Sequence, residues 1–155
     1  MTEQAEEQKS AVELTMYEAC LLHSRADRAL RTVISRHLEQ FDLTMMEWLL
    51  LATVRQGPKE GLTMTAIANT LDVTLPQVTA LSASLSRAKL IRQKVSRQDR
   101  RSRRLVMTTT GQKLLGEVDQ AIDSSFVDWT ADIPVDQLGV YLETVKQLAS
   151  RNHKL

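Results

Sequence analysis

The 155-residue sequence lacks the features that identify membrane and secreted proteins. No apolar run approaches the ~20 residues that a membrane-spanning helix needs. A single cysteine, Cys20, excludes an intramolecular disulfide framework and agrees with a reducing compartment. Residues 1–10 are polar and acidic, which is the reverse of the basic and then apolar layout of a signal peptide. We therefore expect a cytoplasmic protein with no membrane partner.

The sequence also has little of what enzymes require. It contains five glycines and no glycine-rich phosphate loop, no nucleophile and base at a recognisable spacing, and no cluster of metal-ligating residues. His23 and Asp27 are four residues apart on one expected helix, but two ligands do not make a metal site. We expect no catalytic activity, no cofactor and no metal. An enzyme remains an alternative only if Cys20 and His23 converge in an open cleft.

Net charge is low, at +1, but the positive charge is concentrated in one place. Residues 92–104 hold seven basic side chains and one acid, Asp99, so this segment carries +6 and the rest of the chain −5. A basic segment of this kind is typical of proteins that bind nucleic acid. Alone, it is equally typical of a solvated surface hairpin without a partner.

Apolar periodicity predicts a mostly α-helical chain. Steps of three and four residues predict a long amphipathic helix over 11–39 and another from Thr109 or Thr110 to Trp129. After Ile133-Pro134 the pattern resumes and predicts a last helix over about 134–150.

Three shorter helices are predicted between the long ones. Thr44 and Glu47 form a capping box that starts a helix over 45–56, and Gly57-Pro58 ends it. A short helix follows over 64–71, then a turn at Asp72-Val73. The T-x-x-Q sequence at 74–77 starts the next helix, which has a buried stripe to residue 88.

Between residues 90 and 107 the apolar residues form short runs around the basic segment. This change of period predicts two short strands joined by a basic tip, a β-hairpin. Two short helices joined by a tight turn, followed by a basic hairpin, form an arrangement that can read DNA. The second helix fits the major groove, and the arginines of the hairpin neutralise phosphates.

Residues 99–111, DRRSRRLVMTTTG, resemble the wing signature of the MarR family, D-x-R followed by an apolar strand and L-T-x-x-G. Residues 64–91 resemble the helix-turn-helix of the same family, and the long flanking helices resemble its dimerisation region. The resemblance covers nearly the whole chain. It implies a winged helix-turn-helix over 43–109, flanked by dimerisation helices at 11–42 and 110–155 and preceded by a polar tail at 1–10. It also implies a bacterial transcription regulator, with a repressor expected.

The resemblance assigns candidate DNA-binding residues. Arg101 would be the wing-tip residue that enters the minor groove, and Asp99 the acid that holds a neighbouring arginine. Gln77 is the candidate for reading a base edge, because its amide can pair with adenine. The full set is, on the recognition helix, Thr74, Pro76, Gln77, Thr79, Ala80 and Ser82, and on the wing Arg97, Arg100, Arg101 and Arg103.

Two positions depart from the family pattern. Ala80 stands where members often have a basic residue, and Lys89 where they commonly have glycine. The recognition helix is therefore uncharged before Arg87, which shifts the expected affinity toward the wing.

A homodimer is expected because the long helices carry more apolar surface than a winged-helix core can cover. Burial of this surface against a second copy would place two recognition helices about one DNA turn, ~34 Å, apart and imply a palindromic site on double-stranded DNA. A monomer is the alternative.

The signal that switches the regulator is left open. The resemblance favours a small aromatic or amphipathic effector in a crevice lined by Met16, Met45, Trp48 and Leu49, which are otherwise ordinary core residues. Cys20 lies where the peroxide-sensing branch of the family has a reactive cysteine, but Ile34 and Met45 replace the tyrosine partners of that branch. Cys20 is thus a candidate redox centre or a packed apolar residue. A winged-helix module that docks onto protein is the remaining alternative.

Overall fold

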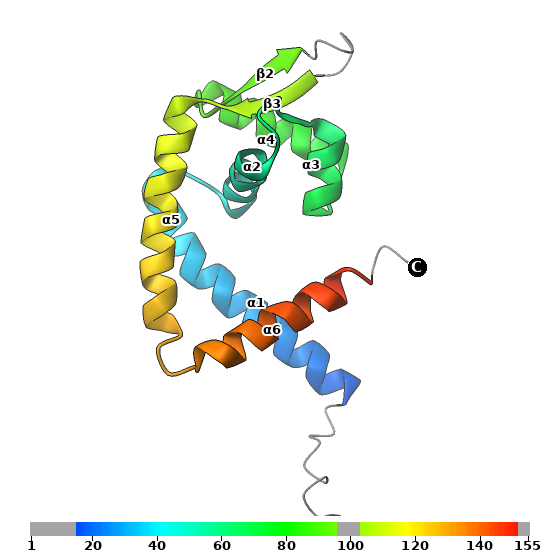
Figure 1. Cartoon of the computed structure of the whole chain (residues 1–155), viewed down its shortest axis with the longest axis vertical. Coiled ribbons are helices and arrows are strands. Elements are labelled where there is room, and N and C mark those ends of the chain that lie inside the picture. The colour runs from blue at the N-terminus through cyan, green and yellow to red at the C-terminus, as the bar shows by residue number, and fades with distance from the viewer. Residues whose placement is uncertain (1–14, 96–102, 152–155) are drawn as a thin grey trace, which may run out of the picture.

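The computed structural model describes residues 15–95 and 103–151, and its helices and small sheet confirm the predicted fold class. Helices α2, α3 and α4 and the sheet form one lobe, and α1, α5 and α6 extend from it (Figure 1). None of the helices in these residues is both long and apolar enough to cross a membrane. In chain order the elements are α1 (Met16–Leu38), a 3-10 turn (Glu39–Phe41), α2 (Met45–Gln56), β1 (Leu62–Thr63), α3 (Met64–Leu71), α4 (Leu75–Arg87), β2 (Ile91–Val95), β3 (Arg103–Met107), α5 (Thr109–Trp129) and α6 (Val135–Ala149).

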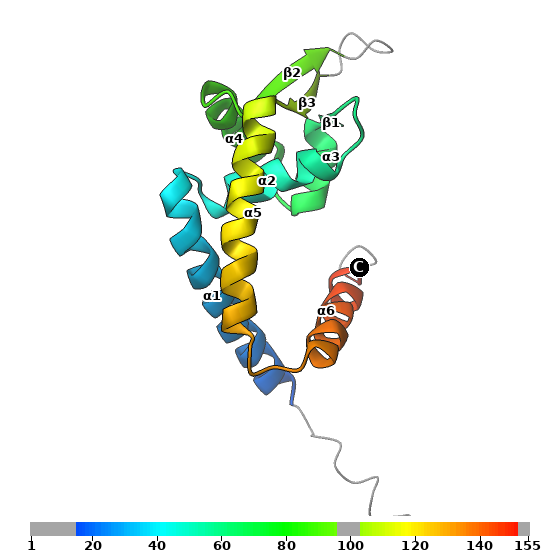
Figure 2. The same cartoon turned by 60° about the vertical axis from the view of Figure 1, so that its left-hand side comes forward.

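Helix α5 connects the lobe to the extension. It starts beside the sheet and runs along α1, against which it packs (Figures 1 and 2). Its first half belongs to the same apolar cluster as the lobe, which also takes in the end of α1. The fully buried members of this cluster are Leu38, Leu50, Leu51, Ile67, Val78, Leu85, Leu105, Leu115 and Val118. The lobe and the long helices therefore share one core.

The predicted start of the first helix is wrong. The sequence pattern places it at residue 11, but α1 begins at Met16, because the Thr15 side chain accepts a hydrogen bond from the N–H of Glu18 while the Glu18 carboxylate accepts from the Thr15 N–H. Thr15 is thus the N-cap of α1, and the predicted helical residues 11–14 lie outside the described residues. The boxes predicted at Thr44 and Thr74 are both confirmed.

The sheet has three strands, whereas the sequence predicts two. Strands β2 and β3 form the expected antiparallel hairpin, and β1 pairs with the other edge of β3, Leu62 opposite Leu105. A strand of two residues carries no periodic signal, so the pattern does not reveal it. Gly61 precedes β1 at φ +90°, and a Cβ there would lie 2.5 Å from the Leu105 carbonyl oxygen.

Helix α5 starts at Thr109, one of the two predicted residues, and Thr108 caps it. Its hydroxyl accepts a hydrogen bond from the Gly111 N–H and donates to the carbonyls of Lys89 (2.7 Å) and Leu90 (3.0 Å). Lys89 has φ +60°, a left-handed conformation that explains why glycine is common at this position in the family the sequence resembles. The end of α4 is thereby fixed to the start of α5.

Gly111→Ala is expected to destabilise the protein, because the added Cβ would lie 2.1 Å from the Leu90 carbonyl oxygen. A cost of about 1–3 kcal/mol in the free energy of unfolding is typical of such overpacking. Urea unfolding measures it. Gly116→Ala is the control: it lies in the same helix with no atom within 4 Å of the added Cβ, so it should stabilise α5 by roughly 0.5–1 kcal/mol. Equal effects of the two variants would contradict this close approach.

Candidate nucleic-acid interface

Helices α3 and α4 form the expected helix-turn-helix. Thr63 caps α3, and its hydroxyl accepts a hydrogen bond from the Ala66 N–H at 3.2 Å. Asp72 ends α3 in the left-handed conformation, at φ +52°, and this confirms the predicted turn. The Val73 N–H then donates to the Ala68 carbonyl, which closes the turn before α4 begins.

The exposed side of α4 carries most of the residues predicted to face DNA. Thr74, Pro76, Gln77, Thr79 and Ala80 are exposed, whereas Val78 is fully buried.

Ser82 is a correction to the prediction. Its side chain is 1% exposed, and its hydroxyl donates to the Thr79 carbonyl at 2.9 Å. Because Ser82 lies four residues after Val78 and three before Leu85, it belongs to the buried stripe of the helix. It is therefore not available to a nucleic acid.

Gln77 has a structural task as well as its predicted one. Its side-chain oxygen accepts hydrogen bonds from the Thr74 N–H and from the Thr74 hydroxyl, each at 2.9 Å. A bidentate pair with adenine needs both the oxygen and the NH₂ group of the amide. In this conformation only the NH₂ group is available to a base.

A contact that sequence reasoning missed joins α4 to α2. One oxygen of the Glu47 carboxylate accepts a hydrogen bond from the Ser84 hydroxyl at 2.7 Å, and the other accepts from the N–H and hydroxyl of Thr44. Burial raises the pKa of the Glu47 carboxyl, but the hydrogen bonds from Ser84 and Thr44 outweigh burial, so its pKa lies below the ordinary value. The capping box predicts only the Thr44 half, since 37 residues separate Glu47 from Ser84.

The hairpin carries the exposed basic side chains that the start of α4 lacks. Arg92 and Lys94 are exposed on β2, and Arg103 is exposed on β3, where it donates to the Gln93 side chain at 3.2 Å. Arg104 instead donates to the Gly61 carbonyl at 3.0 Å and ties β3 to the loop before β1. The other wing candidates, Arg97, Asp99, Arg100 and Arg101, lie outside the described residues.

The candidate residues on α1 do not converge. Cys20 is exposed. The Nδ1 of His23 lies 3.2 Å from the Ala19 carbonyl of its own helix, and Asp27 is paired with Arg31. In residues 15–95 and 103–151, no group of three or more His, Cys, Asp or Glu side chains could hold a metal ion.

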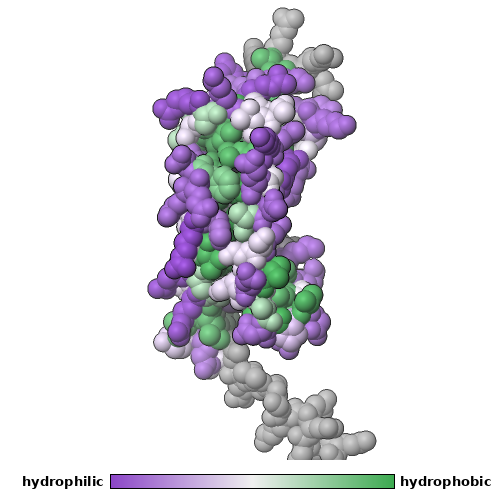
Figure 3. Space-filling view, turned by 90° about the vertical axis from the view of Figure 1, so that its left-hand side faces the viewer, coloured by the Kyte–Doolittle hydropathy of each residue, from purple (hydrophilic) through white to green (hydrophobic). Residues whose placement is uncertain are grey.

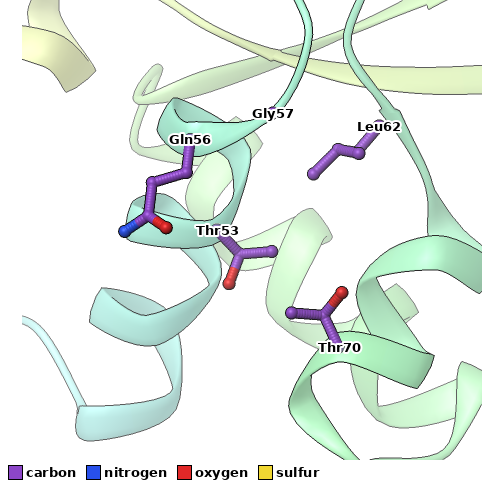
Figure 4. Close-up of a pocket in the computed structure, with 5 residues that line it drawn as sticks. All are labelled: Thr53, Gln56, Gly57, Leu62 and Thr70. Carbon is purple, nitrogen blue, oxygen red and sulfur yellow. The ribbon is translucent and has the colours of Figure 1, made fainter.

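The residues predicted to line an effector crevice are only partly brought together. Met45, Trp48 and Leu49 are half-buried neighbours on α2, but Met16 is exposed at the far end of α1 (Figure 2). Further along α2, a cleft of about 210 Å³ opens toward α3 (Figure 4). Thr53 and Gln56 lie on its α2 side, Leu62 and Thr70 on the other. Both threonine hydroxyls donate to carbonyls of their own helices, so they offer only acceptor lone pairs to a ligand.

Apolar side chains remain exposed on the long helices. In the lower half of the face in Figure 3, where these helices lie, hydrophobic residues reach the surface. Helix α6 has no buried residue, although it carries a full apolar stripe. The large exposed apolar residues of the extension are Met16, Tyr17, Leu21, Leu22, Val127, Trp129, Ile133, Val135, Val140, Tyr141, Leu142 and Leu148.

Comparison with known proteins identifies this architecture. Residues 41–102 match a model of the MarR family. AbsC, a MarR family transcriptional regulator from Streptomyces coelicolor, is 21% identical, with a TM-score of 0.79 over 92% of this chain and 98% of that one. CouR from Rhodococcus jostii, bound to p-coumaroyl-CoA, is 19% identical, with a TM-score of 0.78 over 85% and 92%. MepR from Staphylococcus aureus, in complex with DNA, is 26% identical, with a TM-score of 0.73 over 84% and 96%.

Glu47→Gln is expected to reduce stability in a pH-dependent way. Glutamine can keep the capping box with Thr44. The loss of folding stability therefore measures the contribution of the Glu47 negative charge, which the Ser84 hydroxyl and the start of α2 stabilise. Because the folded-state pKa is lowered, this stability is present above the ordinary pKa, near 4.5, and is lost as the pH falls through the folded-state value. Urea unfolding should give a difference of about 1 kcal/mol at pH 7 that shrinks toward zero below pH 4.

The control for this prediction is Glu117→Gln, which removes an exposed ion pair within α5. It should change the free energy of unfolding by less than about 0.5 kcal/mol throughout. A difference between wild type and Glu47→Gln that stays constant with pH would contradict the role of the charge.

Proposed function

Because the chain belongs to the MarR family of transcription regulators, we propose that it binds double-stranded DNA as a homodimer and represses transcription. The observation that carries the proposal is that the exposed polar start of α4 and the exposed basic residues of β2 and β3 belong to one lobe. The solved complex of MepR with DNA supports the same use of this fold.

The recognition helix would lie in the major groove, which is wide enough to admit an α-helix. Its exposed first turns present Thr74, Pro76, Gln77, Thr79 and Ala80. This surface is uncharged, so it can distinguish base edges but contributes little to neutralising phosphates. Base discrimination is therefore assigned to α4, and most of the affinity to the wing.

The wing would supply the positive charge. Arg92, Lys94 and Arg103 are exposed at the described part of the hairpin. The family resemblance adds Arg97, Arg100 and Arg101, with Arg101 entering the minor groove and Asp99 holding a neighbouring arginine. Contacts between these side chains and phosphates release counterions, so binding should be steeply sensitive to salt.

The exposed apolar residues of the long helices support a dimer. A stripe that no part of the described chain covers is favourable to bury, at ~25 cal/mol per Å². Two-fold pairing through these helices would present two copies of α4 to adjacent turns of the DNA and favour a palindromic site.

An effector would relieve repression by binding between the lobe and the long helices. Met45, Trp48 and Leu49 are half-buried on α2 and would contact such a ligand. The structure of CouR with p-coumaroyl-CoA supports an aromatic or amphipathic ligand. The cleft beside α3, at about 210 Å³, is smaller than the ~300–1,000 Å³ of typical ligand pockets. The second subunit or a movement of α5 would therefore have to complete the site.

A thiol switch at Cys20 is the alternative signal. Its exposure would let an oxidant reach it. If it is the switch, a peroxide should lower DNA affinity in wild type and leave Cys20→Ser unchanged.

Fluorescence anisotropy with the DNA upstream of the protein's own gene tests the main proposal. We expect binding that resists a scrambled competitor and that weakens about 1,000-fold or more between 50 and 200 mM salt. Weak binding that is equal on both DNAs would contradict the proposal of a sequence-specific regulator. It would favour a winged-helix module that docks onto protein.

Gln77→Glu should abolish discrimination between operator and scrambled DNA while keeping the helix intact. Glutamate at the third helical position maintains the capping box, but it removes the NH₂ donor that a base would accept. Anisotropy titrations on both DNAs measure the ratio of affinities.

Gln77→Ala provides the comparison, because it removes both the cap and the donor and should also cost about 1 kcal/mol of stability. If Gln77→Glu retains the wild-type ratio of affinities, Gln77 does not read a base.

Leu142→Glu should convert the dimer to a monomer, because it places a charge in the apolar stripe of α6 between the half-buried Leu138 and Val145. Val140→Glu is the matched control: it lies on the same helix, two residues away and thus on the opposite face, and it is also exposed. Sedimentation equilibrium gives the mass. A dimer that survives Leu142→Glu would exclude this face from the interface.

A further inference from the structure

Helix α5 packs against α1 of the extension and against α2 of the lobe, so it joins the two parts. Leu115 and Val118 are buried in the shared core, and Phe126 and Trp129 lie near its other end. Any change in the angle between α5 and the lobe would therefore move α4 relative to the dimerisation helices.

Asp119 contacts the lobe at the middle of α5. One of its carboxylate oxygens is paired with the Arg55 guanidinium, and the other accepts a hydrogen bond from the Trp48 indole N–H at 3.5 Å. Both partners lie on α2, one near each end of that helix. Two contacts spaced along α2 hold its direction as well as its distance from α5.

This ion pair differs from the others in the described part of the chain. The three other pairs, Arg31–Asp27, Lys113–Glu117 and Lys146–Glu143, each lie within one helix, with side chains more than half exposed. The Arg55 and Asp119 side chains are 39% and 26% exposed, and they join two helices 64 residues apart in sequence. Exposed pairs contribute little, whereas this pair is partly shielded from water and salt.

The recognition helix, α4, is also attached to α2. Glu47, the residue next to Trp48, holds Ser84 of α4 at 2.7 Å. Adjacent residues of α2 thus bind α5 on one side and α4 on the other. Because α2 is a helix of 12 residues, it transmits the position of Asp119 to α4 as one rigid body.

We propose that Asp119 is a positioning residue, which fixes the angle of the DNA-binding lobe on α5 and so sets the distance between the two recognition helices of the dimer. This role rests on the proposed function, since it requires the dimer. Apolar burial of Leu115 and Val118 is non-directional and tolerates small rotations. Hydrogen bonds and ion pairs depend on geometry, so Asp119 selects one angle among those that the core permits.

Pulsed electron–electron double resonance, which measures the distance between two spin labels, tests this role without DNA. A spin label at Ala83→Cys, on the exposed side of α4, is introduced in a Cys20→Ser background. Wild type should give one narrow distance between the two labels of a dimer. In Asp119→Ala the distribution should become at least about twofold broader, and in Asp119→Asn it should fall between the two, because asparagine keeps an acceptor for Trp48 but loses the charge.

Glu117→Ala is the matched control, since it removes another carboxylate from the exposed side of α5 and should leave the distance unchanged. An Asp119→Ala distribution identical to wild type would overturn the proposal while leaving the dimer in place. A wild-type sample with no dipolar coupling would instead show that the dimer itself is absent. If Asp119→Ala does not fold, as judged by circular dichroism, the Asp119→Asn distribution decides, and one identical to wild type would again overturn the role.

A second measurement uses operator DNA whose half-sites are moved apart by one base pair. Wild type should lose affinity about tenfold or more, and Asp119→Ala less than threefold, because its recognition helices can follow the altered spacing. Equal losses would contradict the positioning role. If neither protein binds DNA but the distances between the labels change as expected, the proposed DNA-binding function is contradicted. The role of Asp119 in fixing the angle of the lobe is then still supported.

Discussion

The whole arrangement depends on the attachment of the recognition helix to α5 at Thr108. The Thr108 hydroxyl donates to the carbonyls that follow α4, those of Lys89 and Leu90, and accepts from Gly111 in the first turn of α5. Gly111 is required because the Leu90 carbonyl occupies the space of a Cβ. Strand β2 begins directly after Leu90 and strand β3 ends directly before Thr108, so both ends of the hairpin are fixed by these hydrogen bonds. The wing and the recognition helix are therefore held in a constant relation to each other and to the long helix.

In the proposed mechanism, polar contacts away from this point set the orientation of the lobe. The core supplies cohesion through side chains such as Leu50, Leu51 and Leu115, but apolar burial does not specify a direction. Glu47 and Asp119 provide directional contacts from α2 to α4 and to α5. In the proposed dimer, the DNA-reading surface at the start of α4 would thus be coupled through α2 and α5 to the apolar surface of the long helices.

Local sequence signals predicted the parts of this structure that depend on neighbouring residues. The capping box at Thr44 and Glu47, the turn at Asp72 and the basic hairpin each involve residues a few positions apart, so spacing alone reveals them. The two-residue strand β1 has no period, and the cap at Thr15 competes with an apolar pattern that continues past it. The helical period places Ser82 on the buried side of α4 with Val78 and Leu85, whereas the family resemblance places it at the DNA. The Glu47–Ser84 and Arg55–Asp119 contacts join residues 37 and 64 positions apart, and no sequence spacing encodes them.

Selection of bound DNA from a random-sequence pool is the most direct test of a dimeric regulator that reads DNA through α4. The account predicts enrichment of an inverted repeat, with two half-sites whose centres are about 10 base pairs, one helical turn, apart. The repeat would report sequence-specific contact and two-fold symmetry in a single experiment. Enrichment of one asymmetric motif would contradict the symmetric dimer, and no enrichment at all would contradict sequence-specific DNA binding.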